Sequence, residues 1–352
     1  MKTKRLFGLD LIRAVAIVLV ITIHAFANSY FHTYTINGIN SFILLCLRNI
    51  CLICVPLFIL LTGYLKYNKK LNKDHYKSLK KILIAYVLIS IITVVFDITY
   101  QHNSFDFNKH ILGIFNFTTI SYAWYIEMYI GLFLLIPFLN LIYHNLKTKK
   151  HKQILIITIL FLSSIPYTLY NLKVLNTRID VLPMYWKEIY IIGYYYIGMY
   201  IREYQPKINK ILNILLILLV TIIQSLFMYV LAFNSSIEKT LILDYNSIFT
   251  FIIAVLIFVL LYDINTNKEV IKKPIEVISN TTLEIYLFSY MFDIITYNYA
   301  NRGVVDAVSN CYKSFITNVP LVFILSLLSG IVLRYIIKLV SMIFKKRTKT
   351  LS

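Results

Sequence analysis

The chain has 352 residues, of which 59% are hydrophobic and only 14% charged, and its mean hydropathy is +0.72. A soluble domain is about one quarter charged, so the composition excludes an ordinary soluble protein and predicts that lipid covers much of the apolar surface. The net charge of +19 does not indicate nucleic acid, because the Lys and Arg residues lie mostly in short segments between apolar runs, as in membrane proteins.

The predicted elements are apolar runs that are long enough to cross a bilayer, which takes roughly 17–25 helical residues. The N-terminal sequence MKTKRLFGLD enters the first run without a small-residue cleavage site, which favours a retained helix over a signal peptide. We expect an all-α fold, a polytopic membrane bundle of about ten helices, with one transmembrane domain over residues 1–345 and a short basic tail over 346–352. The ten runs are 8–27, 42–64, 80–98, 121–141, 153–170, 186–201, 208–232, 246–262, 280–298 and 319–343.

The distribution of basic residues predicts the orientation of these helices. Loops on the cytoplasmic side of a membrane protein carry an excess of Lys and Arg. If the N-terminus is cytoplasmic, the chain ends and loops on the cytoplasmic side together hold 24 Lys and Arg residues. The loops on the opposite side hold 7. Both termini are therefore expected in the cytoplasm. The seven residues on the other side are Lys109, Lys173, Arg178, Lys187, Lys239, Arg302 and Lys313.

Three ionisable residues lie in the first run, namely Asp10, Arg13 and His24. Eleven residues separate Arg13 from His24, so a helix places them on nearly the same face and about 16 Å apart along its axis. Asp10 is three residues before Arg13 and close enough to pair with it. Each residue alone also fits a structural hydrogen bond to a neighbouring helix, but ionisable groups in a span are costly and three on one face indicate a functional site.

Successive helices cross the bilayer in opposite directions, so the position of a residue within its run gives its approximate depth in the membrane. At the outer level we expect a histidine that can act as a general base, with carboxylates that can orient it. The inner level is mainly basic. A structural role is equally consistent for three of its residues: Arg334 and Lys338 can extend their side chains toward the cytoplasm, and Glu284 can form a structural ion pair with one of them. The outer set is His24, Arg48, Glu127 and Asp293, and the inner set is Arg13, Lys81, Glu284, Arg334 and Lys338.

The four cysteines predict no disulfide framework and no metal site. Cys46, Cys51 and Cys54 share one apolar run, where cysteine behaves as a small hydrophobic residue, and Cys311 has no nearby cysteine. No other residues have the spacing of metal ligands, and we expect no metal.

Several of these segments resemble the acyltransferase-3 family of membrane proteins, in particular its surface-polysaccharide O-acyltransferase branch. The first helix, LDLIRAVAIVLVITIH, is similar to the family's LD-x-x-R-x(10)-H opening. VPLFILLTGYL, from Val55 to Leu65, is similar to VPLF-x-x-x-SG-x-L, with Thr62 in the serine position. The combination of these two motifs is specific.

The resemblance extends over nearly the whole chain. KSLKKILIAY, from Lys77 to Tyr86, is similar to a basic R-x-x-R stretch, with lysines for the arginines and Ala85 for a proline. AWYIEMYIGLFLLIPFLN and YYIGMYIRE are similar to the family's tryptophan-tyrosine helix and the end of its glycine-tyrosine helix. Near the ninth run the family often has Tyr-Leu-x-His, but here Ser289 stands in the histidine position, which directs attention to Glu284 and Asp293.

The resemblance implies a membrane O-acyltransferase in the plasma membrane of a bacterium. Its donor substrate is a cytoplasmic acyl-CoA, commonly acetyl-CoA, and its acceptor is a hydroxyl group of an envelope polysaccharide. His24 would act as general base or carry the acyl group transiently, and Glu127 or Asp293 would orient its imidazole. The predicted acyl-CoA site comprises Arg13, Asp10, Lys77, Lys80, Lys81 and Arg334.

Other functions remain open from sequence alone. A polysaccharide exporter would also have about ten helices with buried charges, and it would need a wide polar path rather than one histidine. A sensor that kept the fold but lost catalysis would show changes among Asp10, Arg13 and His24, which are all present. Assembly into a homo-oligomer is left open.

Overall fold

The computed structural model describes residues 5–172, 184–238, 243–300 and 307–350. The chain is 81% helical, and its described part contains no β-strand beyond two isolated bridges, which confirms the predicted all-α class. The helices of the described part are α1 (Phe7–Asn28), α2 (Gly38–Cys51), α3 (Cys54–Lys66), α4 (Lys73–Lys77), α5 (Leu79–Thr99), η1 (Asn108–Leu112), α6 (Gly113–Phe115), η2 (Ser121–Ala123), α7 (Trp124–Asn145), α8 (Lys149–Leu162), α9 (Ser164–Leu172), η4 (Met184–Ile189), α10 (Tyr190–Tyr204), α11 (Lys210–Ala232), α12 (Ile248–Leu261), α13 (Glu269–Ala300), α14 (Ala307–Ile316) and α15 (Asn318–Thr350).

Each of the ten predicted runs falls on a helix or on a pair of consecutive helices. Within the described residues, seven segments are long and apolar enough to cross a membrane. They are α1, α2 with α3, α4 with α5, η2 with α7, α8 with α9, α11 and α15 up to Met342. The other three runs fall on α10, α13 and the apolar 14-residue α12. The multi-pass membrane architecture is thus established, and the count of about ten spans stays a prediction.

Proline explains why two predicted runs each form two helices. The run 42–64 is broken between α2 and α3, four residues before Pro56, and the run 153–170 is broken between α8 and α9 close to Pro166. Proline has no backbone N–H and cannot bond the carbonyl group four residues earlier, which is that of Leu52 or Leu162. Each break thus coincides with a missing backbone hydrogen bond, whereas α7 and α13 continue through Pro137 and Pro274.

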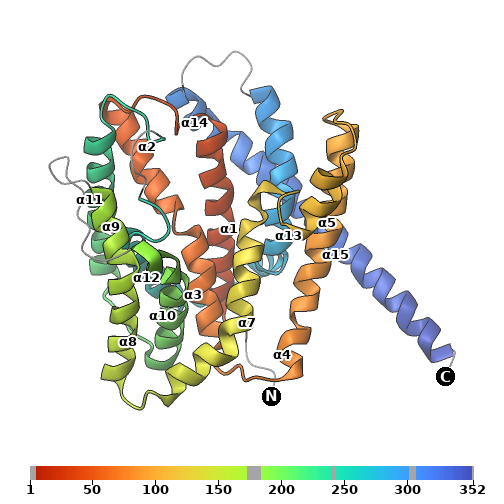
Figure 1. Cartoon of the computed structure of the whole chain (residues 1–352), viewed down its shortest axis with the longest axis horizontal. Coiled ribbons are helices and arrows are strands. Elements are labelled where there is room, and N and C mark those ends of the chain that lie inside the picture. Colours follow the sequence, from red (N-terminus) through yellow and green to blue (C-terminus); the bar gives the residue numbers. More distant parts are fainter. Residues whose placement is uncertain (1–4, 173–183, 239–242, 301–306, 351–352) are drawn as a thin grey trace.

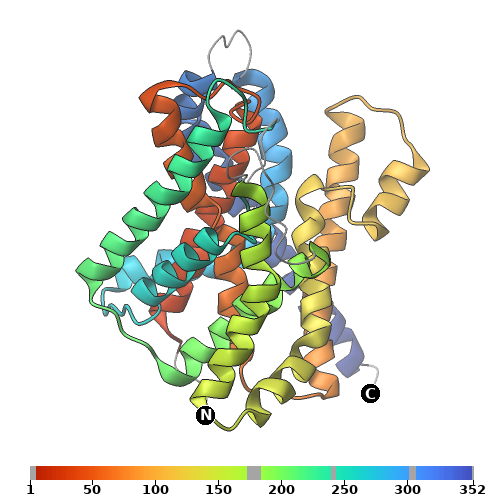
Figure 2. The same ribbon diagram turned by 60° about the vertical axis from the view of Figure 1, so that its left-hand side comes forward.

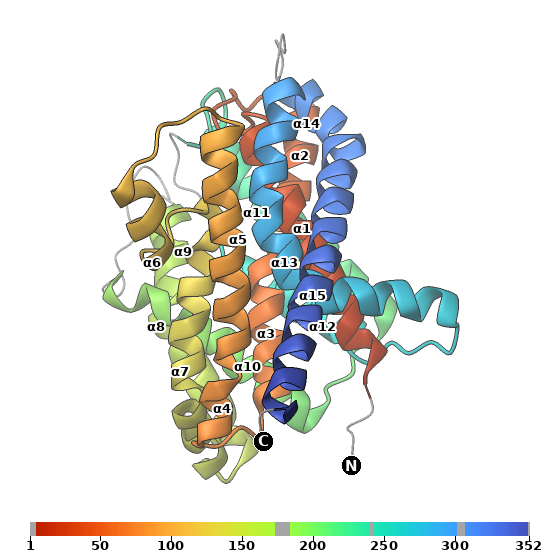
Figure 3. The same ribbon diagram turned by 90° about the vertical axis from the view of Figure 1, so that its right-hand side faces the viewer.

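Helix α1 lies at the centre of the bundle. It packs against α3 and α13 and also against α2, α12, α14 and α15. Figure 2 shows α5 and the gold segment that follows it on one side of the molecule, and Figure 3 shows α5, α13 and α15 side by side. A residue on α1 can therefore face several helices at once.

The two ends of the bundle differ in charge. Helix α1 begins and α15 ends at the same end, which we call the basic end because the lysine-rich connections from α3 to α4 and from α7 to α8 lie there. The other, far end carries the outer turns of α5 and α13. Helix α15 continues to Thr350, through most of the predicted tail. Of the residues behind the predicted charge asymmetry, Lys2, Lys4, Lys173, Arg178, Lys239 and Arg302 lie outside the described residues.

Helices α3 and α10 cross with their backbones in direct contact. A methyl group added at Gly63 would collide with the carbonyl group of Tyr195, and one added at Gly198 would collide with that of Leu60. Small residues at such a crossing let two membrane helices approach closely, and van der Waals packing then holds them together. The TG pair of the VPLFILLTG motif is therefore partly a packing feature.

We predict that Gly198→Ala destabilises the protein, because the new methyl group forces α3 and α10 apart. The expected loss in free energy of unfolding is about 1–3 kcal/mol, as for overpacked cores. The measurement is the midpoint of thermal unfolding of the purified protein in detergent. Gly131→Ala in α7 is the matched control, since nothing lies within 4 Å of the added methyl group. Equal midpoints for the two variants would contradict the close crossing.

Candidate active site

The carboxylate of Asp10 joins the start of α1 to α13. Arg13 Nη1 donates to Asp10 Oδ1 at 2.9 Å, and Ser279 Oγ donates to the same oxygen at 2.6 Å. Arg5 also pairs with Asp10 and reaches Glu276 on α13 at 2.9 Å. The side chain of Asp10 is only 6% exposed, and that of Arg13 is 27% exposed. The pairing predicted between Asp10 and Arg13 is present, and it leaves part of the Arg13 guanidinium accessible.

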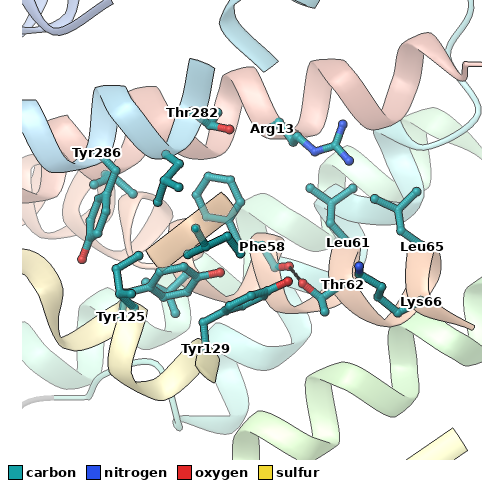
Figure 4. Close-up of a pocket in the computed structure, with 15 residues that line it drawn as sticks. Arg13, Phe58, Leu61, Thr62, Leu65, Lys66, Tyr125, Tyr129, Thr282 and Tyr286 are labelled. Carbon is teal, nitrogen blue, oxygen red and sulfur yellow. Dashed lines mark hydrogen bonds between the residues drawn. The ribbon is translucent and has the colours of Figure 1, made fainter. Parts of the chain in front are cut away.

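Arg13 reaches into a cavity of about 340 Å³ enclosed by α1, α3, α5, α7 and α13, which we call the central cavity. Figure 4 shows Arg13 and Lys66 at one end of this cavity and Tyr125 and Tyr286 toward the other. Most of its remaining wall is apolar, with a few hydroxyl groups. The cavity thus has a cationic end and an aromatic end.

The sequence motifs supply much of this wall. Val55, Phe58 and Thr62 line the central cavity at positions i, i+3 and i+7, so they form one face of α3. Tyr125 and Tyr129 of the AWYIEMYIG segment line it from α7. The Thr62 hydroxyl donates to the carbonyl group of Phe58 at 2.8 Å. The VPLFILLTG motif therefore has a cavity face, and its glycine packs against α10.

A second cavity, of about 440 Å³, lies at the basic end and shares Arg13 and Leu65 with the central cavity. We call it the basic-end cavity, and three arginines line it, Arg5, Arg13 and Arg202. Arg202 lies against the ring of Tyr64 at 5.1 Å and contacts its hydroxyl at 3.3 Å. Such a concentration of guanidinium groups suits an anionic ligand, because each presents a fork of donors that matches phosphate.

His24 lies farther along the same face of α1. Its ring stacks on the ring of Tyr122, with centroids 3.6 Å apart and planes inclined by 12°. Tyr122 donates from its hydroxyl to Asp293 Oδ2 at 2.8 Å. Within the described part of the chain, neither ring nitrogen of His24 has a hydrogen-bond partner. The structure therefore connects Asp293, one of the two carboxylates predicted to orient the imidazole, to His24 through Tyr122.

Tyr122 and Asp293 line a third cavity, of about 560 Å³, toward the far end. Four tyrosines contribute to its wall, Tyr30, Tyr122, Tyr290 and Tyr297, and we call it the tyrosine cavity. The hydroxyl of Tyr286, which lines the central cavity, donates to the backbone carbonyl of Tyr122.

The three cavities follow α1 from one end to the other. Along this helix, Arg13 and Val20 line the central cavity and Asn28 lines the tyrosine cavity. His24 is one helical turn from both Val20 and Asn28, so it lies between the two cavities.

The other predicted catalytic carboxylate and the predicted donor-binding cations lie elsewhere. Glu127 is exposed at the first turn of α7, and among the described residues no hydrogen bond or ion pair joins it to His24. Arg334 of α15 lies 3.7 Å from Glu284, on the side of α13 where Glu284 packs against Gly330. Lys77, Lys80 and Lys81 are exposed on α4 and α5 at the basic end, and Lys77 pairs with Asp74 at 3.1 Å.

Arg48 belongs to a separate polar cluster. It is buried in α2 and donates from Nε to His32 Nε2 at 3.2 Å. Burial and the charge of Arg48 lower the pKa of His32 to about 4. Burial raises the pKa of Asp244 above its usual range, and Arg48 opposes that shift. These groups lie where α2 meets the loop before α12, and within the described residues no hydrogen bond or ion pair connects them to His24.

Sequence reasoning missed the residues whose role depends on packing. Tyr122, Tyr286 and Arg202 have no feature of their own in a chain with 29 tyrosines and 35 basic residues. Tyr286 and Arg202 do lie inside the family-like segments EIYLFSYMFD and YYIGMYIRE. In the first of these, Ser289 is fully buried and donates to the carbonyl group of Tyr286 at 2.8 Å. It replaces the family's histidine with a residue that bonds its own helix.

Comparison with known protein families identifies a match over most of the chain. A family model described as an acyltransferase domain, of the acyltransferase-3 type, matches residues 6–337. No curated protein and no solved structure matches the chain.

We predict that Asp10→Asn lowers the free energy of unfolding by about 3 kcal/mol, the order found when one partner of a buried ion pair is removed. Two guanidinium groups would lose their carboxylate at the start of α1, where Asp10 is buried against α13. The measurement is thermal unfolding in detergent. Asp74→Asn removes an exposed pair and should change the free energy by less than about 1 kcal/mol. If both variants unfold at the same temperature, Asp10 does not hold α1 against α13.

Proposed function

The chain belongs to the acyltransferase-3 family, and we propose that this membrane acyltransferase moves an acyl group from cytoplasmic acyl-CoA to a hydroxyl group of an envelope polysaccharide. Acetyl is our leading assignment for that group, and the plasma membrane of a bacterium our leading assignment for the location. The proposal includes about ten membrane spans with both termini in the cytoplasm. The observation that best supports the proposal is the row of cavities along α1. Arginines line the cavity at one end, and His24 lies farther along, between the central cavity and the tyrosine cavity.

In this proposal the phosphate groups of the donor bind at the basic-end cavity. Arg5, Arg13 and Arg202 line that cavity, and guanidinium groups bind phosphate through paired hydrogen bonds. The pantetheine arm would follow the central cavity, whose wall of leucines and tyrosines suits a chain that is largely apolar with a few amides. About 16 Å along the axis of α1 separates Arg13 from His24, so an extended arm would bring the thioester to the histidine.

His24 has ring nitrogens without partners in the described structure, as a group that exchanges protons with substrates requires. The acceptor oxygen attacks the thioester carbonyl carbon, and His24 takes the hydroxyl proton. The carbon–oxygen bond forms and the carbon–sulfur bond breaks, and the departing thiolate takes the proton back from His24. The products are the ester and free CoA thiol. A general base of this kind contributes about 10²- to 10⁴-fold to the rate.

A route through the histidine fits the same geometry. His24 would attack the thioester carbonyl first and carry the acyl group, while the carbon–sulfur bond breaks and the CoA thiolate takes the proton of the imidazole ring. The acceptor hydroxyl would then take the acyl group in a second step and return its proton to the imidazole. Both routes require the ring of His24 to keep its orientation, and the stacked ring of Tyr122 supplies that restraint. Asp293, which accepts a hydrogen bond from the Tyr122 hydroxyl, holds that tyrosine in place.

We predict that His24→Ala lowers the rate of thiol release from acetyl-CoA at least 100-fold in the presence of crude envelope glycan, because the general base is lost. Arg13→Ala should also impair the reaction, mainly by weakening donor binding. The measurement is thiol release by the protein in nanodiscs, with His151→Ala, an exposed histidine of α8, as the matched control. A folded wild-type protein that neither binds acyl-CoA nor releases thiol would favour the exporter instead.

We further predict that Arg202→Gln raises KM for acetyl-CoA about tenfold and leaves kcat nearly unchanged. This is the pattern for a contact made equally in the ground and transition states. The same change at Arg334 tests its assignment to the donor site. Arg334 pairs with Glu284 on the side of α13 that faces α15. We therefore expect the Arg334→Gln variant to have a KM for acetyl-CoA close to that of wild type. The opposite ranking of the two variants would place the donor phosphates along α15.

A further inference from the structure

A fourth cavity continues the row at the far end of the bundle. It has a volume of about 700 Å³ and is lined by the last turn of α5, the loop after it and the last turns of α13. We call it the distal cavity. It shares Ile294 and Asn298 with the tyrosine cavity, so the two form one groove that begins at Tyr122, the residue on which His24 stacks, and leads away along α13.

The lining of the distal cavity mixes polar and apolar groups, and His102 contributes an imidazole to it. Gln101, Asn103 and Asn298 bring side-chain amides, and Tyr100 and Tyr299 bring aromatic rings. None of the described residues that line it is Lys, Arg, Asp or Glu. An amide offers a donor and an acceptor, as a hydroxyl group does, and an aromatic ring covers an apolar face. This chemistry fits a neutral ligand rich in hydroxyl groups, and it gives no support to a phosphate or another anion.

The loop that carries the amides is held in one shape by Asp97. This carboxylate accepts hydrogen bonds from Lys109 Nζ at 2.7 Å and Asn103 Nδ2 at 2.9 Å, and it lies 2.8 Å from His110 Nε2. Asn103 also donates from its backbone N–H to the carbonyl group of Asp97 at 3.2 Å. The far wall of the groove is therefore preorganised, which reduces the entropy cost of binding.

The groove is longer than one sugar ring. Tyr290, Asp293, Tyr297 and Asn298 lie on one face of α13, and helix rise places the first and the last of them about 12 Å apart. A single pyranose ring at the Tyr122 end of the tyrosine cavity would leave the distal cavity empty.

We infer that the acceptor is a chain of at least two sugar units that lies along this groove. The unit that receives the acyl group occupies the tyrosine cavity beside His24 and Tyr122, and a neighbouring unit occupies the distal cavity, in contact with Gln101, Asn103 and Asn298. The inference rests on the proposed acyl transfer to a glycan and makes it more specific, because it assigns a second sugar subsite to residues remote from the reacting atoms.

The test compares acceptors of different length. Envelope polysaccharide from the cells that make the protein would be partially hydrolysed and separated into fragments of one to six sugars. Each fragment would be added to the protein in nanodiscs with acetyl-CoA, and thiol release and ester formation would be measured. We expect kcat/KM to rise at least tenfold from one sugar to longer fragments. The double variant Gln101→Ala, Asn298→Ala should lose most of that rise, since it removes two hydrogen-bonding groups of the second subsite.

Asn145→Ala, an exposed asparagine at the end of α7, is the matched control and should keep the full length dependence. Equal rates with one sugar and with longer fragments would overturn the inference. So would acceptance of a lipid-linked single sugar in preference to the fragments, or thiol release that depends on His24 but responds to no fragment. Absence of any thiol release that depends on His24 would overturn the proposed function itself, and the inference with it.

Discussion

The interaction on which the rest of the structure depends is the hydrogen-bonded group around Asp10. One buried carboxylate holds the guanidinium groups of Arg13 and Arg5 and the hydroxyl of Ser279, and so ties the central helix α1 to α13. A lone charge inside a membrane protein is costly, and a compensated group of this kind is tolerated because every member has a partner. The tie sets the register of the two helices that carry His24 and Asp293.

Register matters because the site is assembled across helices. The face of α1 carries Arg13 and His24, and the facing side of α13 carries Tyr286 and Asp293. Between them, Tyr122 stacks on His24, donates to Asp293 and accepts the hydroxyl of Tyr286 at its backbone. Three segments thus meet at one ring. A shift of α13 by one residue would rotate its side chains by about 100° and separate them from Tyr122.

The parts of this arrangement that sequence could predict are those that belong to one helix. The spacing of Asp10, Arg13 and His24 predicted their common face, and apolar run length placed helices at the right residues. Contacts between helices were not predictable, because side-chain identity says nothing about the partner across an interface. Glu127 and Asp293 looked equivalent as carboxylates at one depth, yet one is exposed and the other buried against Tyr122. The helix breaks close to Pro56 and Pro166 were not predicted, because run length alone does not show where a span is interrupted.

The shape of the path also bears on the choice between transfer and export. A polysaccharide exporter needs a wide polar passage from one side of the membrane to the other. In the described structure the central cavity is largely apolar, and the stacked rings of His24 and Tyr122 lie between it and the tyrosine cavity. The largely apolar central cavity and the more polar tyrosine cavity therefore approach the same histidine from opposite sides, without one continuous polar lining. An acyl group is small and apolar enough to pass such a point, whereas a chain of hydroxylated sugars would lose its hydrogen bonds there. The arrangement thus favours acyl transfer, in which the donor and the acceptor reach His24 from separate cavities.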